Sequence, residues 1–124
     1  MSVADSILVP SLIVALTLTV VCAAMWAMTR SGRLGLNPLV GIRTRATMAS
    51  PEAWRRGHLA AQPALVAAVR VGIVGLVLAG LARLVLPTSA SVVAAVIGLL
   101  AALVPFGLLL YGTLLADRAA RSGD

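Results

Sequence analysis

Two long stretches of this chain, residues 7–28 and residues 92–115, carry no charged side chain. The first has 22 residues and would be about 33 Å long as an α-helix, at ~1.5 Å per residue. That length matches the hydrocarbon core of a bilayer, which is ~30 Å thick. A charge-free stretch of this length is typical of a transmembrane helix, so the sequence predicts at least two membrane crossings.

A third apolar stretch, residues 64–86, is interrupted by Arg70 and Arg83. Both arginines lie near an end of the stretch, so their long stems can carry the guanidinium groups to the lipid headgroups. Pro105, in the middle of the last stretch, lacks a backbone N–H and predicts a kink there. We therefore predict an all-α membrane protein. Its single membrane domain covers residues 1–124, with three transmembrane helices at about 7–28, 64–86 and 92–115.

The composition agrees with a lipid environment. Hydrophobic residues make up 60% of the chain, charged residues 11%, and the mean hydropathy is +1.05, whereas soluble domains are about half apolar and a quarter charged. The net charge of +6 comes from arginines confined to short segments between apolar stretches. This placement is typical of membrane orientation and contact with anionic headgroups, and it argues against nucleic-acid binding.

The segments that flank the apolar stretches differ in charge. Six arginines lie between the first and second stretches and two lie in the tail, which places eight of the ten on one side: Arg30, Arg33, Arg43, Arg45, Arg55, Arg56, Arg118 and Arg121. The segment before the first stretch and the link between the second and third hold none. By the positive-inside rule the arginine-rich side is cytoplasmic, so we expect the N-terminus outside and the C-terminus inside.

Residues 29–62, the predicted cytoplasmic loop, form the only long polar segment. Asn37 and Pro38 are a pair that starts turns. The next residues, 39–44, read LVGIRT and are too apolar for a free loop. We expect them to lie against the membrane interface or to re-enter between the helices.

The second half of this loop contains a helix start. Ser50 is a suitable N-cap, Pro51 suits the first helical position, and Glu52 suits the positive end of the helix dipole. The helix would carry Trp54 and His58 along one face. We predict a short interfacial helix here, with the alternative that it leads directly into the second span.

The loop also carries a recognisable pattern. The string Asn37-Pro38-Leu39-Val40-Gly41-Ile42-Arg43-Thr44 is followed by Thr47, Met48, Ser50, Trp54 and His58. This pattern resembles the signature of the SdpI-like family, bacterial membrane proteins named for an immunity protein against a secreted sporulation-delaying toxin. Met48 stands where leucine is usual, and Leu59 where the family often has arginine. Longer members carry an extra N-terminal membrane module.

The resemblance implies a protein of the bacterial cytoplasmic membrane that confers toxin immunity or senses an envelope-active peptide. It would bind its partner and not catalyse a reaction. A structural accessory subunit of a larger membrane complex is the alternative, followed by a homo-oligomeric channel or transporter. We expect anionic membrane lipids at the inner face, and a protein or peptide partner or a second copy of the chain. No cofactor is expected, and no catalytic motif indicates an enzyme.

Two interpretations of the polar residues in the loop stay open. Four of them lie beside the helix start and have the chemistry of an anion site for a phosphate or carboxylate: Arg43, Thr44, Arg45 and Thr47. Alternatively, the arginines only set the topology and touch lipid phosphates. His58 has no Cys, Asp or Glu partner at metal-ligand spacing, so we expect hydrogen bonding and no metal.

The loop is expected to be an ordered unit, because a flexible linker needs neither its apolar residues nor a glycine and an arginine at set places. We expect Arg43 to point inward onto backbone carbonyls and Arg45 to reach solvent or headgroups. Trp54 and His58 should cover the loop.

Small residues recur every four positions in the second and third stretches, as in Gly75 and Ala79, and in Ala94 and Gly98. Helices in lipid need such residues to approach closely. We expect these two pairs to face each other within the chain; the alternative is that one set faces a partner.

The predicted topology is testable with reporter fusions. Fusions after Met28 and after Asp124 should report a cytoplasmic location, and a fusion after Ser89 an external one, because the arginine-rich segments stay inside. External signals from both arginine-rich segments would reverse the orientation.

Overall fold

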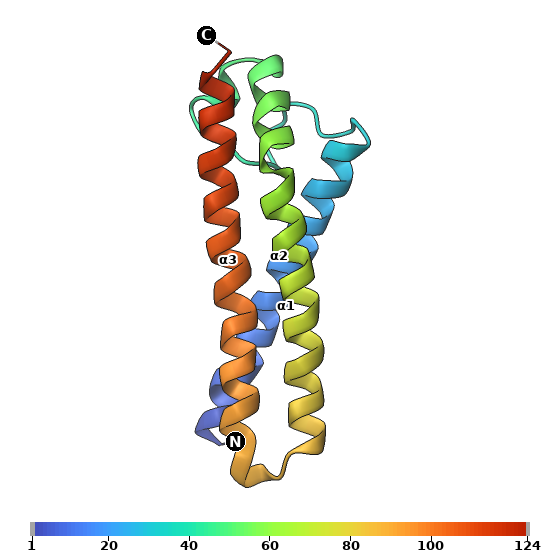
Figure 1. Cartoon of the computed structure of the whole chain (residues 1–124), viewed down its shortest axis with the longest axis vertical. Coiled ribbons are helices and arrows are strands. Elements are labelled where there is room, and N and C mark those ends of the chain that lie inside the picture. The colour runs from blue at the N-terminus through green and yellow to red at the C-terminus, as the bar shows by residue number, and fades with distance from the viewer. Residues whose placement is uncertain (1, 124) are drawn as a thin grey trace.

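The computed structural model describes residues 2–123, and within them it holds three long helices and no strand. Helix α1 covers Val3–Arg30, α2 covers Pro51–Val85 and α3 covers Ser91–Arg121, with two 3-10 turns at Thr47–Ala49 (η1) and Thr88–Ala90 (η2). All three helices are long and apolar enough to cross a membrane. The all-α membrane architecture with three spans is confirmed (Figure 1).

The helix that starts at Pro51 is not a separate interfacial helix. It begins as predicted, with the Ser50 hydroxyl accepting a hydrogen bond from the backbone N–H of Ala53 at 3.0 Å. It then continues through Pro63 to Val85 as one helix. A proline removes only one helical hydrogen bond, and the residues around it are held by packing, since Ala61 and Ala64 are buried. The predicted alternative, direct continuation into the second span, is the one found.

Helix α3 likewise continues through Pro105 without interruption. The sequence predicts a kink at this proline, and the structure keeps the helix continuous from Ser91 to Arg121. The Pro105 ring is fully buried in the bundle. Tertiary contacts therefore hold the helix on both sides of the missing hydrogen bond.

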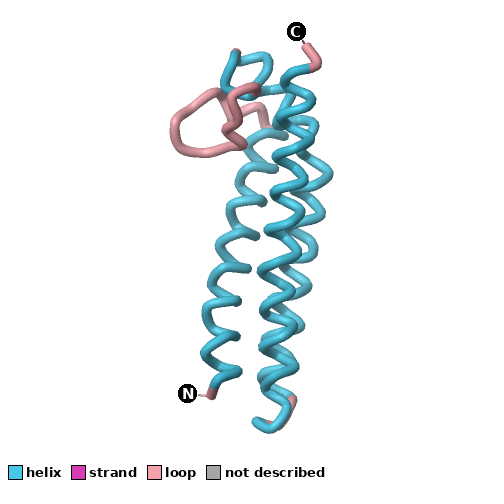
Figure 2. The backbone as a smooth tube through the Cα atoms, turned by 90° about the vertical axis from the view of Figure 1, so that its left-hand side faces the viewer, coloured by secondary structure: helices cyan, strands magenta, loops and turns pink. Residues whose placement is uncertain are grey.

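Helices α2 and α3 lie side by side and antiparallel, with the most extensive contact in the molecule. Helix α1 crosses this pair at an angle (Figures 1 and 2). Its N-terminal part packs Ala4 and Leu8 against Ala79 and Ala94. The loop between α1 and α2 folds over the end of the bundle that also holds the C-terminus (Figure 2).

Small residues let the helices approach closely. A Cβ atom on Gly75 would lie 2.5 Å from the Cβ of Ala101, so these two backbones are nearly in contact. Ala79 and Ala94 share a buried cluster, as expected, whereas Gly98 faces Leu8 of α1 and not α2. Packing within the chain thus uses both sets of small residues.

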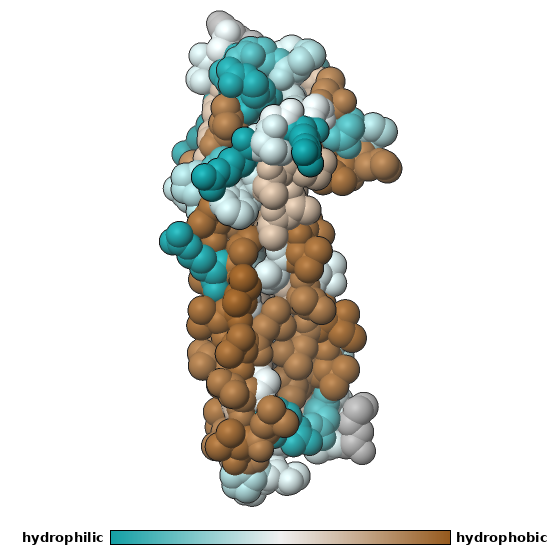
Figure 3. All heavy atoms as spheres, turned by 90° about the vertical axis from the view of Figure 1, so that its right-hand side faces the viewer, coloured by the Kyte–Doolittle hydropathy of each residue, from teal (hydrophilic) through white to brown (hydrophobic). Residues whose placement is uncertain are grey.

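The large apolar side chains point outward. A broad apolar band covers the middle of the bundle, between polar ends (Figure 3). Long aliphatic residues such as Leu81 and Leu103 are more than half exposed. Ion pairs lie at the ends of the helices, for example between Arg83 and Asp5 at 3.4 Å. This distribution suits a surface in contact with lipid, where an apolar exterior costs nothing.

Candidate functional site

The site is built on the loop that joins α1 and α2, residues 31–50, here called the motif loop. Asn37 organises its first half. The Asn37 side-chain amide donates to the carbonyls of Gly35 and Val40, at 2.8 and 3.0 Å. Its oxygen accepts the backbone N–H groups of Leu39 and Val40, at 2.9 and 2.8 Å. One side chain thereby replaces the hydrogen bonds that a helix or strand would supply.

Thr47 organises the second half. Its hydroxyl is fully buried, donates to the Ile42 carbonyl oxygen at 2.8 Å and accepts the Thr44 backbone N–H at 2.9 Å. In return the Thr44 hydroxyl accepts the Thr47 backbone N–H at 3.2 Å. The two threonines therefore satisfy each other's backbone and close the turn that leads to η1.

The His58 ring joins the motif loop to α2. Its Nε2 atom accepts the backbone N–H of Ile42 at 2.8 Å, and its Nδ1 atom lies 2.8 Å from the Trp54 carbonyl oxygen. Because an N–H donates to Nε2, the proton of the neutral ring must be on Nδ1, where it is donated to Trp54. A protonated ring would lose the bond to Ile42.

Trp54 provides a second link to the loop. Its indole N–H donates to the carbonyl oxygen of Leu34 at 3.0 Å, and the side chain is only 1% exposed. The Trp54 and His58 rings contact each other with centroids 4.2 Å apart. Both aromatic side chains thus lie under the motif loop and are buried by it.

Gly41 lies directly against these two rings. Its φ of +128° belongs to the region that favours glycine. A Cβ atom here would lie 2.5 Å from Cη2 of Trp54 and 2.8 Å from Nε2 of His58. Backbone conformation and space both demand glycine, which explains its place before Ile42.

The two loop arginines differ from each other. The Arg43 guanidinium donates to the carbonyl oxygen of Pro38, so it does bond the loop backbone as predicted. Its side chain is nevertheless exposed and not directed inward, whereas the preceding residue, Ile42, is buried. Arg45 is exposed.

The hydroxyl groups that the sequence assigns to a possible anion site already make hydrogen bonds within the protein. The Thr44 and Thr47 hydroxyls are used within the loop, and the Ser50 hydroxyl already binds the first turn of α2. The sequence did not predict the hydrogen bonds that side chains make to backbone atoms far away in the chain. For example, the Arg56 guanidinium donates to the Ala120 carbonyl oxygen at the end of α3, at 3.1 Å.

A hollow of about 470 Å³ lies between the motif loop, α1 and α3. Loop residues 39–43 form one wall, and Val20, Met25 and Leu109 are among the apolar residues of the others. Arg43 supplies the cationic group of this lining. The wall residues on α1 and α3 are distant in sequence from the loop, and only the folded bundle brings them to it.

Almost all of the motif loop lies within the part of the chain that matches a known protein family. The SdpI/YfhL family profile matches residues 33–110, which include the whole motif, α2 and most of α3. The chain belongs to the SdpI/YfhL protein family. No curated protein and no solved structure matches it. In this SdpI-family protein, the pattern from Asn37 to His58 forms one hydrogen-bonded unit.

The fit of Gly41 predicts a large effect of a single methyl group. Gly41→Ala should destabilise the protein by about 1–3 kcal/mol or more, through overpacking and backbone strain. Gly35→Ala is the matched control, because a Cβ atom at Gly35 meets nothing within 4 Å. Thermal unfolding in detergent measures both variants. Equal melting temperatures would show that the loop does not hold Gly41 against the rings.

His58 also predicts a dependence of stability on pH. His58 precedes the membrane-spanning stretch, and burial lowers its pKa from the usual 6.5, partly opposed by the bond to Trp54. A lowered pKa in the folded state means that the unfolded chain binds more protons, so stability is greatest above about pH 6.5 and declines as the pH falls below it.

His58 is the only histidine, and hydrogen bonds and arginine neighbours lower the pKa values of Asp5, Glu52 and Asp117 further into the acid range. His58→Gln should therefore be less stable at neutral pH but should lose most of the slope between pH 5 and 7. Unfolding curves across that range measure it. An unchanged slope in the variant would contradict the prediction.

Proposed function

We propose that this SdpI-family protein protects its own membrane by binding a small apolar peptide in the hollow beside the motif loop. Family membership supports a link to immunity. The observation that carries the proposal is the hollow itself, because the family motif forms one of its walls.

The chemistry of the hollow defines the peptide. Its walls are aliphatic, with Val20, Met25 and Leu109 on the helices and Leu39 on the loop. A peptide segment of Leu, Ile, Val or Phe side chains would be buried here. Arg43 at the same wall would pair with a carboxylate, either an acidic side chain or the C-terminus of the peptide.

The place of the hollow suits a peptide that is already in the membrane. Two of its walls are faces of membrane-spanning helices, so an inserted peptide would reach it sideways, along the bilayer. We propose that the loop faces the cytoplasm and that the membrane is the bacterial cytoplasmic membrane, as the arginine distribution indicates. Binding, and not catalysis, would then keep the peptide from assembling into a toxic form.

The proposal is tested by deleting the gene and challenging the cells with a panel of membrane-active peptides. Deletion should sensitise the cells to at least one of them, and the wild-type gene should restore resistance. Arg43→Gln should restore little, since losing a charged hydrogen bond weakens binding about tenfold or more. Arg45→Gln, which removes a neighbouring exposed charge, should restore fully.

Membrane abundance of each variant is measured on the same samples, so that a loss of protein is distinguished from a loss of function. Undiminished resistance of the deletion strain to every peptide, or equal rescue by the Arg43 and Arg45 variants, would contradict the proposal.

A second candidate, an accessory subunit of a larger membrane complex, is favoured by one observation. Leu39 of the motif loop is 86% exposed, so most of its side chain is available for contact with another protein. Purification in mild detergent followed by mass spectrometry separates the two functions. A large partner in equal amount, lost on Leu39→Ser, would support the accessory role.

A further inference from the structure

Arg70 is a cation within the membrane-spanning part of α2. It lies six residues after Ala64, which is about 9 Å along the helix at ~1.5 Å per residue. The next twelve residues, 71–82, carry no charge. A charged side chain at such a depth is costly, and it normally marks a partner or a functional site.

Arg70 has no acidic partner among the residues that the structure describes. The ion pairs of the described acids, Asp5, Glu52 and Asp117, all lie at the ends of helices and use other arginines. The Arg70 side chain is exposed on the surface of the bundle. Its charge is therefore left for a molecule outside the chain.

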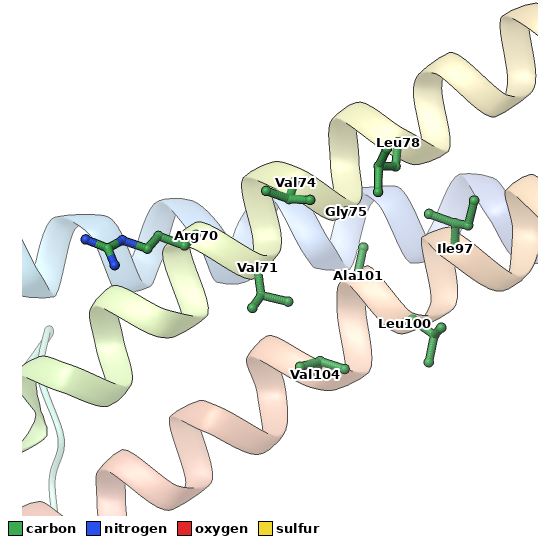
Figure 4. Close-up of a pocket in the computed structure, with 9 residues that line it drawn as sticks. All are labelled: Arg70, Val71, Val74, Gly75, Leu78, Ile97, Leu100, Ala101 and Val104. Atoms are coloured by element: carbon green, nitrogen blue, oxygen red, sulfur yellow. The ribbon is translucent and has the colours of Figure 1, made fainter.

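An apolar groove of about 410 Å³ runs along α2 and α3 from Arg70 (Figure 4). Its residues are aliphatic except for Arg70, and include Val71, Val74, Leu100 and Val104. Figure 4 shows the Arg70 side chain extending along the helix, away from the apolar residues and toward the end that holds the motif loop. The groove thus has one charged end and an apolar length.

The small residues between α2 and α3 create this groove. Gly75 and Ala101 bring the two backbones together at its floor. Longer side chains, such as Leu78 and Ile97, stand on both sides of them. A groove with small residues at its base and longer side chains along its edges has the shape to hold a linear hydrocarbon chain.

We propose that this groove is a binding site for an anionic phospholipid of the leaflet on the motif-loop side. One acyl chain would lie along Val71, Val74 and Leu100, and the phosphate would pair with Arg70 near the headgroup region. Basic pockets between transmembrane helices bind anionic headgroups in this way. A second copy of the chain fits less well, because the described acids are already paired. This site is separate from the hollow and does not rest on the proposed function.

Native mass spectrometry of the detergent-purified protein tests the site. Phosphatidylglycerol, an anionic lipid, and phosphatidylcholine with the same acyl chains are added separately. The wild type should retain phosphatidylglycerol several-fold better than phosphatidylcholine. Arg70→Gln should lose this preference, and Arg70→Lys should keep most of it. Arg118→Gln, which removes another exposed arginine from the same end of the bundle, should behave as the wild type does.

A second variant tests the groove independently of the charge. Val74→Trp places a large ring in the groove on an exposed position, and it should reduce phosphatidylglycerol binding with Arg70 still present. Excess inorganic phosphate should displace no lipid, because the acyl chain contributes to binding. Equal retention of both lipids, full binding by Arg70→Gln, or a lipid-free dimer abolished by Val74→Trp would overturn the proposal.

Discussion

Every backbone N–H and C=O group at the depth of a bilayer has to find its partner within the protein, because lipid tails offer none. The three helices meet this requirement by themselves. The motif loop at the end of the bundle is irregular from Ser31 to Ala46 and lacks the repeating hydrogen bonds of a helix. Its backbone is satisfied by side chains instead: Asn37 within the loop, Thr47 at the turn, and His58 and Trp54 from α2. The family motif is the set of residues that makes this irregular segment a closed structure.

The lipid environment also determines how the helices pack against each other. Lipid removes the hydrophobic effect as a force that drives helices together, so contact depends on close approach and dispersion. Gly75 against Ala101 and Gly112 against Ala64 allow that approach. Because small residues occupy the helix contacts, the large aliphatic side chains lie on the outside, and valine and leucine line the groove between α2 and α3. The apolar surface of the bundle is therefore grooved and not flat.

The two surfaces proposed to bind other molecules differ in the contacts that form them. The hollow beside the motif loop depends on long-range hydrogen bonds, and its arginine bonds the loop that bears it. The groove at Arg70 depends only on the contact between α2 and α3. The described acidic residues form their ion pairs with other arginines and not with Arg70. We propose a peptide as the ligand of the first and a phospholipid as the ligand of the second.

The sequence by itself determined the three apolar helices, because their length and apolar composition suit a structure in lipid. It also determined that α2 starts after Ser50 and that the motif loop is ordered. It did not determine that α2 continues through Pro63, that α3 continues through Pro105, or that Arg43 stays exposed. The continuity of both helices depends on neighbours distant in the chain, which bury Ala61 and Ala64 beside Pro63 and bury the ring of Pro105. The hollow and the groove were likewise decided by the tertiary structure, since each needs side chains from different helices at one depth. Local propensity describes a single helix, whereas these features arise only where helices meet.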